Sequence, residues 1–161
     1  MRVFTLIGIM LLTACGRWMP AGFWDEFHPE LIQKNKNDQG PWGGHRATWW
    51  KATDPYTFTP DKVIRFATLH GWAFVDTMAY EAIIGGRHHF PLGHSGIDTS
   101  QVNNFTHHPF PIWTTLPSTL YRFKTDWITV VPGTDEAYDA YGYVVIDRSG
   151  KEMTVYHLWG E

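Results

Sequence analysis

The chain has 161 residues, with 13 lysine or arginine residues against 16 aspartate or glutamate residues and a formal net charge of −3. This near balance, without a cluster of basic side chains, argues against nucleic acid as a partner, because phosphate backbones require a positively charged surface. The length suits one domain with one core, and the nine tryptophans are expected mainly inside that core, where large aromatic side chains contribute most.

The first fifteen residues have the features of a secretory signal. Arg2 gives a positive start, residues 3–12 form an apolar run too short to span a bilayer, and two small residues precede Cys15. The run Leu12-Thr13-Ala14-Cys15 resembles the lipobox of bacterial lipoproteins. The resemblance implies that residues 1–14 are removed and that Cys15 becomes an N-terminus carrying fatty acyl chains such as palmitate.

Lipidation of Cys15 would hold the protein at the bacterial cell envelope through its acyl chains. Gly16 stands where enteric lipoproteins retained in the inner membrane carry an aspartate, so the outer membrane, at its periplasmic face, is favoured. Cys15 is also the only cysteine. Once it is acylated, no thiol remains for a disulfide, a thiolate nucleophile or a cysteine-containing zinc site.

No sustained hydrophobic period runs through residues 15–44. Scattered aromatic residues are followed by a polar stretch at 33–39 and a glycine-rich end at 40–44. We interpret residues 15–44 as a lipidated N-terminus and partly packed tether, in which a short helix over 24–34 is an option. Residues 45–161 then form a single domain.

The clearest local pattern is a helix over residues 60–70. Thr59 is a favourable N-cap, Pro60 suits the first helical position, and Gly71 provides a left-handed stop. Apolar side chains recur at i, i+3, i+4 and i+7, so this face is expected to pack on a sheet. The residues on this face are Val63, Phe66, Ala67 and His70.

Several stretches have the alternation or the β-branched and aromatic content of strands. They are residues 45–52, 72–80, 120–131, 144–146 and 153–159, the last two flanking a turn at 147–150 that ends in glycine. Alternation places Trp49 and Trp50 on opposite faces. The sequence predicts an α+β fold, an antiparallel sheet of about four or five strands with the 60–70 helix packed on one face.

Residues 85–118 read as a long loop, and an irregular stretch of that length is uncommon unless it is functional. It contains five of the nine histidines of the chain: His88, His89, His94, His107 and His108. Neutral imidazole is a frequent ligand of zinc and copper, and each adjacent pair would supply one ligand, completed by Asp98 or water. The spacing matches no helix-based metal motif, and histidines stacked among loop aromatics are the alternative.

Other candidate catalytic residues have weaker support from the sequence. The run Gly93-His94-Ser95-Gly96 lacks the final glycine of a nucleophile elbow, although Ser95 could act with a loop histidine and Asp98. The acidic pairs at 25–26 and 135–136 fit solvated loops better than a glycosidase site. We expect His70 to stabilise a helix end and His157 to be structural, at a sheet edge or in the hairpin.

Two functions follow. The first is a lipid-anchored envelope lipoprotein that acts as a binding or interaction module, of accessory or immunity type, for an envelope protein or a cell-wall component. The second is a metal-binding protein or metal-dependent hydrolase that uses the loop histidines with zinc or copper. No residue spacing supports a particular reaction, so we expect a binding protein rather than an enzyme.

Overall fold

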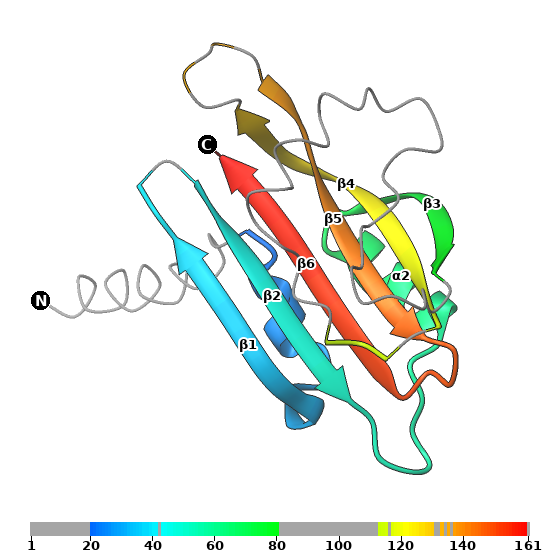
Figure 1. The fold of residues 1–161 in the computed structure, drawn as a ribbon. Helices are drawn as coiled ribbons and strands as arrows, with labels where there is room; N and C mark the ends of the chain where they lie inside the picture. The colour runs from blue at the N-terminus through cyan, green and yellow to red at the C-terminus, as the bar shows by residue number, and fades with distance from the viewer. Residues whose placement is uncertain are drawn as a thin grey trace, which may run out of the picture.

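The computed structural model describes residues 20–41, 43–80, 113–115, 117–130, 133, 135 and 137–160. Six strands form one open sheet in the order β1-β2-β6-β5-β4-β3, with neighbouring strands antiparallel (Figure 1). A single parallel contact joins Thr129 to Gly160. The predicted α+β class is confirmed, and the sheet has six strands where about four or five were expected.

The elements follow one another along the chain in the order of their labels. The strands are β1 (Ile32–Gln39), β2 (Gly43–Lys51), β3 (Ala73–Tyr80), β4 (Ser118–Val130), β5 (Ala137–Asp147) and β6 (Glu152–Gly160). The helices of the described ranges are two short 3-10 helices, η2 (Gly22–Glu26) and η3 (Pro29–Leu31), and the α-helix α2 (Pro60–Leu69). The predicted helix over 60–70 is therefore confirmed to within one residue.

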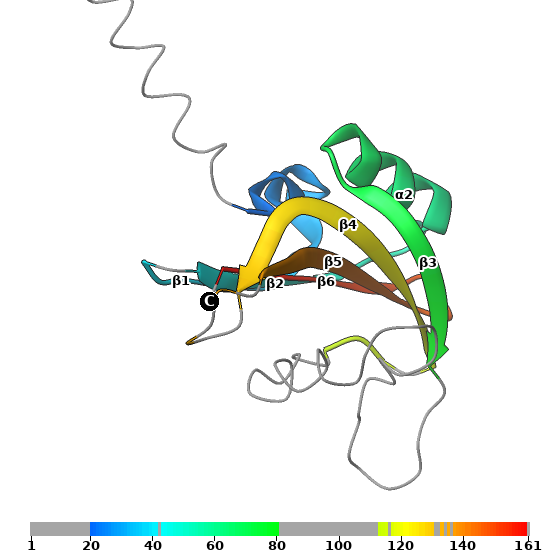
Figure 2. The ribbon, with the colours of Figure 1, turned by 90° about the horizontal axis from the view of Figure 1, so that it is seen from above.

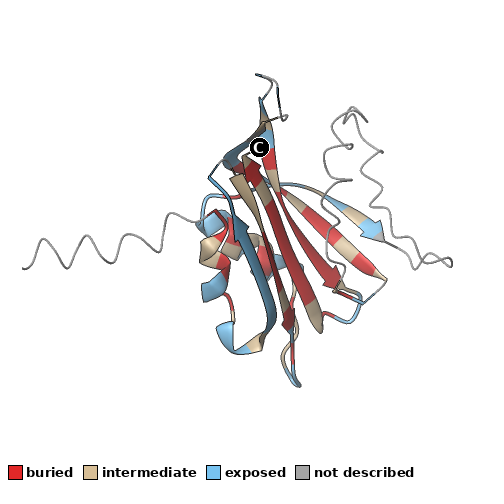
Figure 3. Cartoon of the chain, turned by 60° about the vertical axis from the view of Figure 1, so that its left-hand side comes forward, coloured by how far each residue is buried: buried red, intermediate tan, exposed pale blue. Residues whose placement is uncertain are grey.

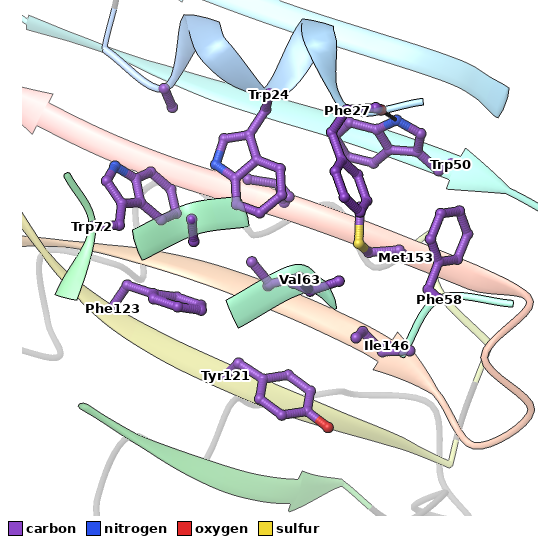
Figure 4. Packing of buried hydrophobic residues seen from close by; sticks show 14 of the residues in the cluster. Trp24, Phe27, Trp50, Phe58, Val63, Trp72, Tyr121, Phe123, Ile146 and Met153 are labelled. Carbon is purple, nitrogen blue, oxygen red and sulfur yellow. Dashed lines mark hydrogen bonds between the residues drawn. The ribbon is translucent and has the colours of Figure 1, made fainter. Parts of the chain in front are cut away.

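The three helices lie on one side of a strongly curved sheet, and β3 and β4 bend towards α2 (Figure 2). The main core lies between these layers and consists largely of aromatic rings (Figure 4). The central strands β5 and β6 are buried along most of their length, whereas β1 is exposed (Figure 3). Large buried side chains include Trp24, Trp50, Phe123, Met153 and Trp72.

The segment expected as a partly packed tether is integral to the domain from residue 20 onward. Trp24 of η2 is fully buried, and the Trp50 indole N–H donates to the carbonyl of Phe27 at 2.7 Å. The polar stretch at 32–39 forms the edge strand β1, paired with β2. The short helix considered over 24–34 is not formed. This range instead holds parts of two 3-10 helices and the start of a strand.

The two faces of the sheet bury different residues, as the adjacent tryptophans predict. Trp50 packs in the main core, whereas Trp49 lies on the opposite face, where the Lys34 ammonium is 5.2 Å from the centroid of its ring. A second buried cluster occupies this opposite face, with Trp113 packed against it. Its members are Ala47, Leu120, Tyr143, Val145 and Tyr156.

Candidate binding site

The site residues predicted from sequence lie outside the described residues. These are Cys15, His88, His89, His94, His107 and His108, together with Ser95 and Asp98. Within the described ranges, no group of three or more histidine, cysteine, aspartate or glutamate residues could hold a metal ion. Lipidation and metal binding both stay predictions, and metal analysis of the purified protein tests the second directly.

The two histidines expected to be structural can be placed. His70 follows the last residue of α2, and its Nδ1 is 2.8 Å from the carbonyl oxygen of Phe66 in the last helical turn. His157 lies in β6, a central strand, and not at a sheet edge as one of our interpretations had it. It is fully buried and stacks on Trp159.

A pocket of about 350 Å³ opens beside the first turn of α2, at the end of the sheet where β5 ends and β6 begins. Four segments far apart in the chain form its walls. They are Thr57–Pro60 before and at the start of α2, Ala79 of β3, Pro117–Thr119 with Tyr121 at the start of β4, and Ile146–Gly150. A pocket of this size suits a small molecule or one residue of a larger partner.

The turn between β5 and β6 forms one rigid wall. Asp147 Oδ2 accepts a hydrogen bond from the Ser149 backbone N–H at 3.0 Å, and Oδ1 accepts one from Glu152 N–H at 2.7 Å. Gly150 has a φ of 69°, in the left-handed region that favours glycine. A Cβ there would lie 2.8 Å from the carbonyl oxygen of Phe58, so the glycine also permits this close approach.

The same close approach fixes the opposite wall. Phe58 N–H donates to the carbonyl of Gly150 at 2.7 Å, which ties the loop before α2 to the turn. Thr59 is extended at the N-cap, its carbonyl accepts the N–H of Val63 at 3.2 Å, and its hydroxyl makes no capping hydrogen bond. A backbone hydrogen bond thus joins the two walls of the pocket, and the Asp147 carboxylate holds the turn.

Tyr121 forms the floor of the pocket at the border of the main core. Its ring packs with the core residues, and its hydroxyl points away from Phe123 (Figure 4). Burial raises the pKa of the Tyr121 phenol, the negative charge of Asp61 raises it further, and a hydrogen bond with Thr119 opposes both. The phenol is therefore neutral at physiological pH and can both donate and accept a hydrogen bond.

The chemistry of the walls fits a small group with both an apolar surface and hydrogen-bonding atoms. Phe58, Ile146 and the ring of Tyr121 provide apolar contact, and threonine hydroxyl groups border it. Arg148 supplies a positive charge among the lining residues, while the carboxylate of Asp147 is occupied within its own turn. Sugar rings and peptide groups have this combination of properties.

Two of the segments that line the pocket were predicted from the sequence, but the contact between them was not. The helix start at Thr59 and Pro60 and the glycine turn at 147–150 were both predicted. Their contact depends on the order of the strands, which no local pattern gives. Tyr121 carries no sequence signal that separates it from the other large residues of its strand.

Comparisons with models of protein families, with curated proteins and with solved structures give no match to this chain. Among the described residues, no helix has the length and apolar character needed to cross a membrane. The site must therefore be interpreted from its own geometry.

Proposed function

We propose that this chain is a lipid-anchored lipoprotein of the bacterial envelope that acts as a binding module through the pocket beside the first turn of α2. The observation that carries the proposal is the distance in sequence between the lipobox cysteine and the fold. Pro20 and Ala21 are already buried, so only four residues separate Cys15 from the first buried position. An acylated Cys15 would attach the domain almost directly to the membrane.

The position of the pocket supports a role in binding. The first described turn of the N-terminal segment contacts the C-terminal end of α2, where the rings of Phe23 and His70 stack at 4.7 Å. The pocket lies at the other end of this ten-residue helix, roughly 15 Å away at 1.5 Å per residue. In Figure 2 the start of α2 is likewise on the far side of that helix from η2. The pocket would be turned away from the anchor.

The volume of the pocket limits the size of the group that it can bind. It holds one side chain of a protein partner, or one sugar or amino-acid unit of a cell-wall fragment, rather than a whole folded surface. An accessory or immunity-type lipoprotein that engages an envelope protein, and a lipoprotein that engages the cell wall, both meet this requirement. The periplasmic face of the outer membrane is the proposed location.

The first experiment concerns the anchor. The protein is isolated from bacterial membranes, and the mass of its N-terminal peptide is measured. A peptide that begins at Cys15 and carries acyl chains supports the proposal. A peptide that retains residues 1–14, or an unmodified Cys15, contradicts it.

The second experiment concerns the pocket and uses the lipidated protein in living cells. A photoreactive amino acid replaces Thr57 or Ser149 at the pocket, or Lys36 on the exposed strand β1 as the control. We expect the two pocket positions to give the same crosslinked protein or cell-wall product, and position 36 not to give it. The substitution Tyr121→Phe removes one hydroxyl and should weaken the crosslink by roughly 2–10-fold, the loss of one hydrogen bond. Equal products from all three positions would contradict a role for the pocket.

A further inference from the structure

Five large apolar side chains among the described residues are more than 40% exposed, and all of them come from three segments that lie next to one another. They come from the last turn of α2, the first residues of β3 and the last part of β4. We call this surface the apolar rim; it consists of Leu69, Phe74, Val75, Trp127 and Ile128. An exposed apolar cluster of this kind usually marks a contact surface.

The three elements that carry the apolar rim meet at the end of α2. A Cβ placed on Gly71 would lie 3.9 Å from the Asp126 carboxylate, so the end of α2 passes beside β4 at this point. Leu69 precedes Gly71 by two residues, and Trp127 directly follows Asp126. Phe74 is paired in register with Phe123, and their rings are 5.8 Å apart.

The rim lies beside η2, the first helix that follows Cys15 in the described part of the chain. Phe23 stacks on His70, the residue after Leu69, and its ring is 5.4 Å from that of Trp72. From Cys15 to Pro20 the chain can extend at most about 18 Å, at up to 3.6 Å per residue. An acylated Cys15 would therefore keep this side of the domain within one short tether length of the bilayer.

We propose that the apolar rim rests in the interfacial layer of the membrane that holds Cys15. This inference depends on the lipoprotein function proposed above. Tryptophan and large aliphatic side chains are those that insert at the boundary between headgroups and acyl chains. The charges nearby are the Lys124–Asp139 ion pair at 2.7 Å, the Arg122–Asp76 ion pair, Arg65 one turn before Leu69 on α2 and the carboxylate of Asp126, so positive and negative charges balance. The contact is therefore apolar, and phosphatidylethanolamine headgroups suffice for it.

The placement of the rim favours a lipid surface over an added strand from a protein partner. A strand pairing with the outer edge of β3 would follow residues 73–80. Leu69, Trp127 and Ile128 lie beyond the start of β3, where such a strand would not cover them. Adjacent residues of a strand tend to point to opposite faces, so covering both members of the pairs 74–75 and 127–128 requires a medium that surrounds this end of the sheet, as a lipid layer does.

The test uses the lipidated protein in vesicles of phosphatidylethanolamine and phosphatidylglycerol. Attachment of a diacylglyceryl group through a glycerol carbon would convert the Cys15 thiol to a thioether, and the sequence has no other cysteine, so one introduced cysteine can carry a polarity-sensitive fluorophore. The variants are Leu69→Cys and Ile128→Cys at the rim, with Ser149→Cys at the pocket and Lys36→Cys on β1 as matched exposed controls. Lipids with brominated acyl chains should quench the probes at positions 69 and 128 and leave those at 149 and 36 unquenched.

The outcomes separate this inference from the function on which it rests. If Cys15 is acylated and the four probes are quenched equally or not at all, the membrane contact is wrong while the lipoprotein proposal stands. If the rim probes respond to an added envelope protein and not to brominated lipid, the partner is a protein and the inference is overturned. If Cys15 is not acylated, the proposed function fails first. The double variant Leu69→Gln with Ile128→Gln should reduce the quenching of the intrinsic tryptophan fluorescence by brominated lipid.

Discussion

Gly142 of β5 lies directly against the indole ring of Trp72, with no room for a side chain between them. A Cβ at position 142 would be 2.2 Å from two carbon atoms of the ring, well inside any van der Waals contact. Trp72 is 4% exposed and its ring packs 5.8 Å from that of Phe123, so it cannot move out of the way without opening the core. The glycine is therefore required by packing rather than by backbone conformation.

The substitution Gly142→Ala is expected to destabilise the protein by about 1–3 kcal/mol or more, the usual range for overpacking a core. The measurement is the free energy of unfolding from a urea titration followed by fluorescence. Gly40→Ala is the control, because its nearest contact is the backbone oxygen of Gly43 at 3.4 Å. Replacing Trp72 by leucine in the Gly142→Ala background should restore part of the loss. Equal stability of the two alanine variants would contradict a packing role for this glycine.

The N-terminal segment is also held by an ion pair whose two partners differ in exposure. The guanidinium of Arg46 is 3% exposed and donates to the carboxylate of Asp25, which is 49% exposed and also accepts from Asn35 at 3.0 Å. Asp25→Ala leaves a buried guanidinium without its acceptor, which should cost about 1–3 kcal/mol. Arg46→Met in the same chain removes the buried charge, so the double variant should be more stable than Asp25→Ala alone. A double variant less stable than both single variants would contradict this explanation.

Local sequence patterns predicted much of the fold because their physical causes are local. The N-cap at Thr59 and the stop at Gly71 bounded α2, and Gly150, with its positive φ, marked the turn of the last hairpin. Alternation located β3 and β4 within a few residues. The opposite placement of Trp49 and Trp50 follows from the pleat of a strand alone.

What the sequence did not predict depends on contacts distant along the chain. Residues 32–39 form β1 without any apolar alternation, since almost every side chain of this edge strand is exposed. Its strand conformation comes from pairing with β2. The pocket likewise required the β5–β6 turn to meet the loop before α2, and the strand order decides that contact.

A hydrogen-bonded chain of three titratable residues connects η3 to the loop before α2. Tyr56 Oη is 2.7 Å from His28 Nε2, and His28 Nδ1 is 3.1 Å from a carboxylate oxygen of Glu30. Burial raises the pKa of the Tyr56 phenol, and the negative charge of Glu30 raises it further. Because the neutral phenol is favoured in the folded state, this contribution to stability is present below the ordinary pKa of 10.0 and is lost as the pH rises through the folded value.

We expect Glu30→Gln to lower the pKa of Tyr56, because it removes the negative charge while keeping a side chain of the same size. The pKa is measured by NMR titration of ring-labelled tyrosine, with the Tyr56→Phe variant identifying the signal. Glu26→Gln, on the neighbouring 3-10 helix, is the matched control and should leave this titration where it is. An unchanged titration in Glu30→Gln would contradict the effect of the carboxylate.

His157 makes the central strands sensitive to acid. The side chain is fully buried, its ring lies 5.4 Å from that of Trp72 and 5.3 Å from that of Trp159, and its Nε2 is 3.3 Å from the hydroxyl oxygen of Thr125. Burial lowers the pKa of His157 from 6.5 to about 3. The folded protein therefore keeps this imidazole neutral at pH values where the unfolded chain binds a proton.

This difference sets the direction of the pH dependence. The stabilising contribution is complete above pH 6.5, where both states are neutral, and it is lost progressively as the pH falls from 6.5 towards about 3. Over that window His157 should contribute a slope of up to one proton, about 1.4 kcal/mol per pH unit.

His157→Phe keeps an aromatic ring between the two indoles, so its unfolding free energy should fall less steeply with acid, even though loss of the Thr125 contact makes it less stable near neutral pH. The slope is measured by urea titration at several pH values. If wild type and His157→Phe lose stability in parallel between pH 6.5 and pH 4, the acid sensitivity comes from groups other than this buried imidazole.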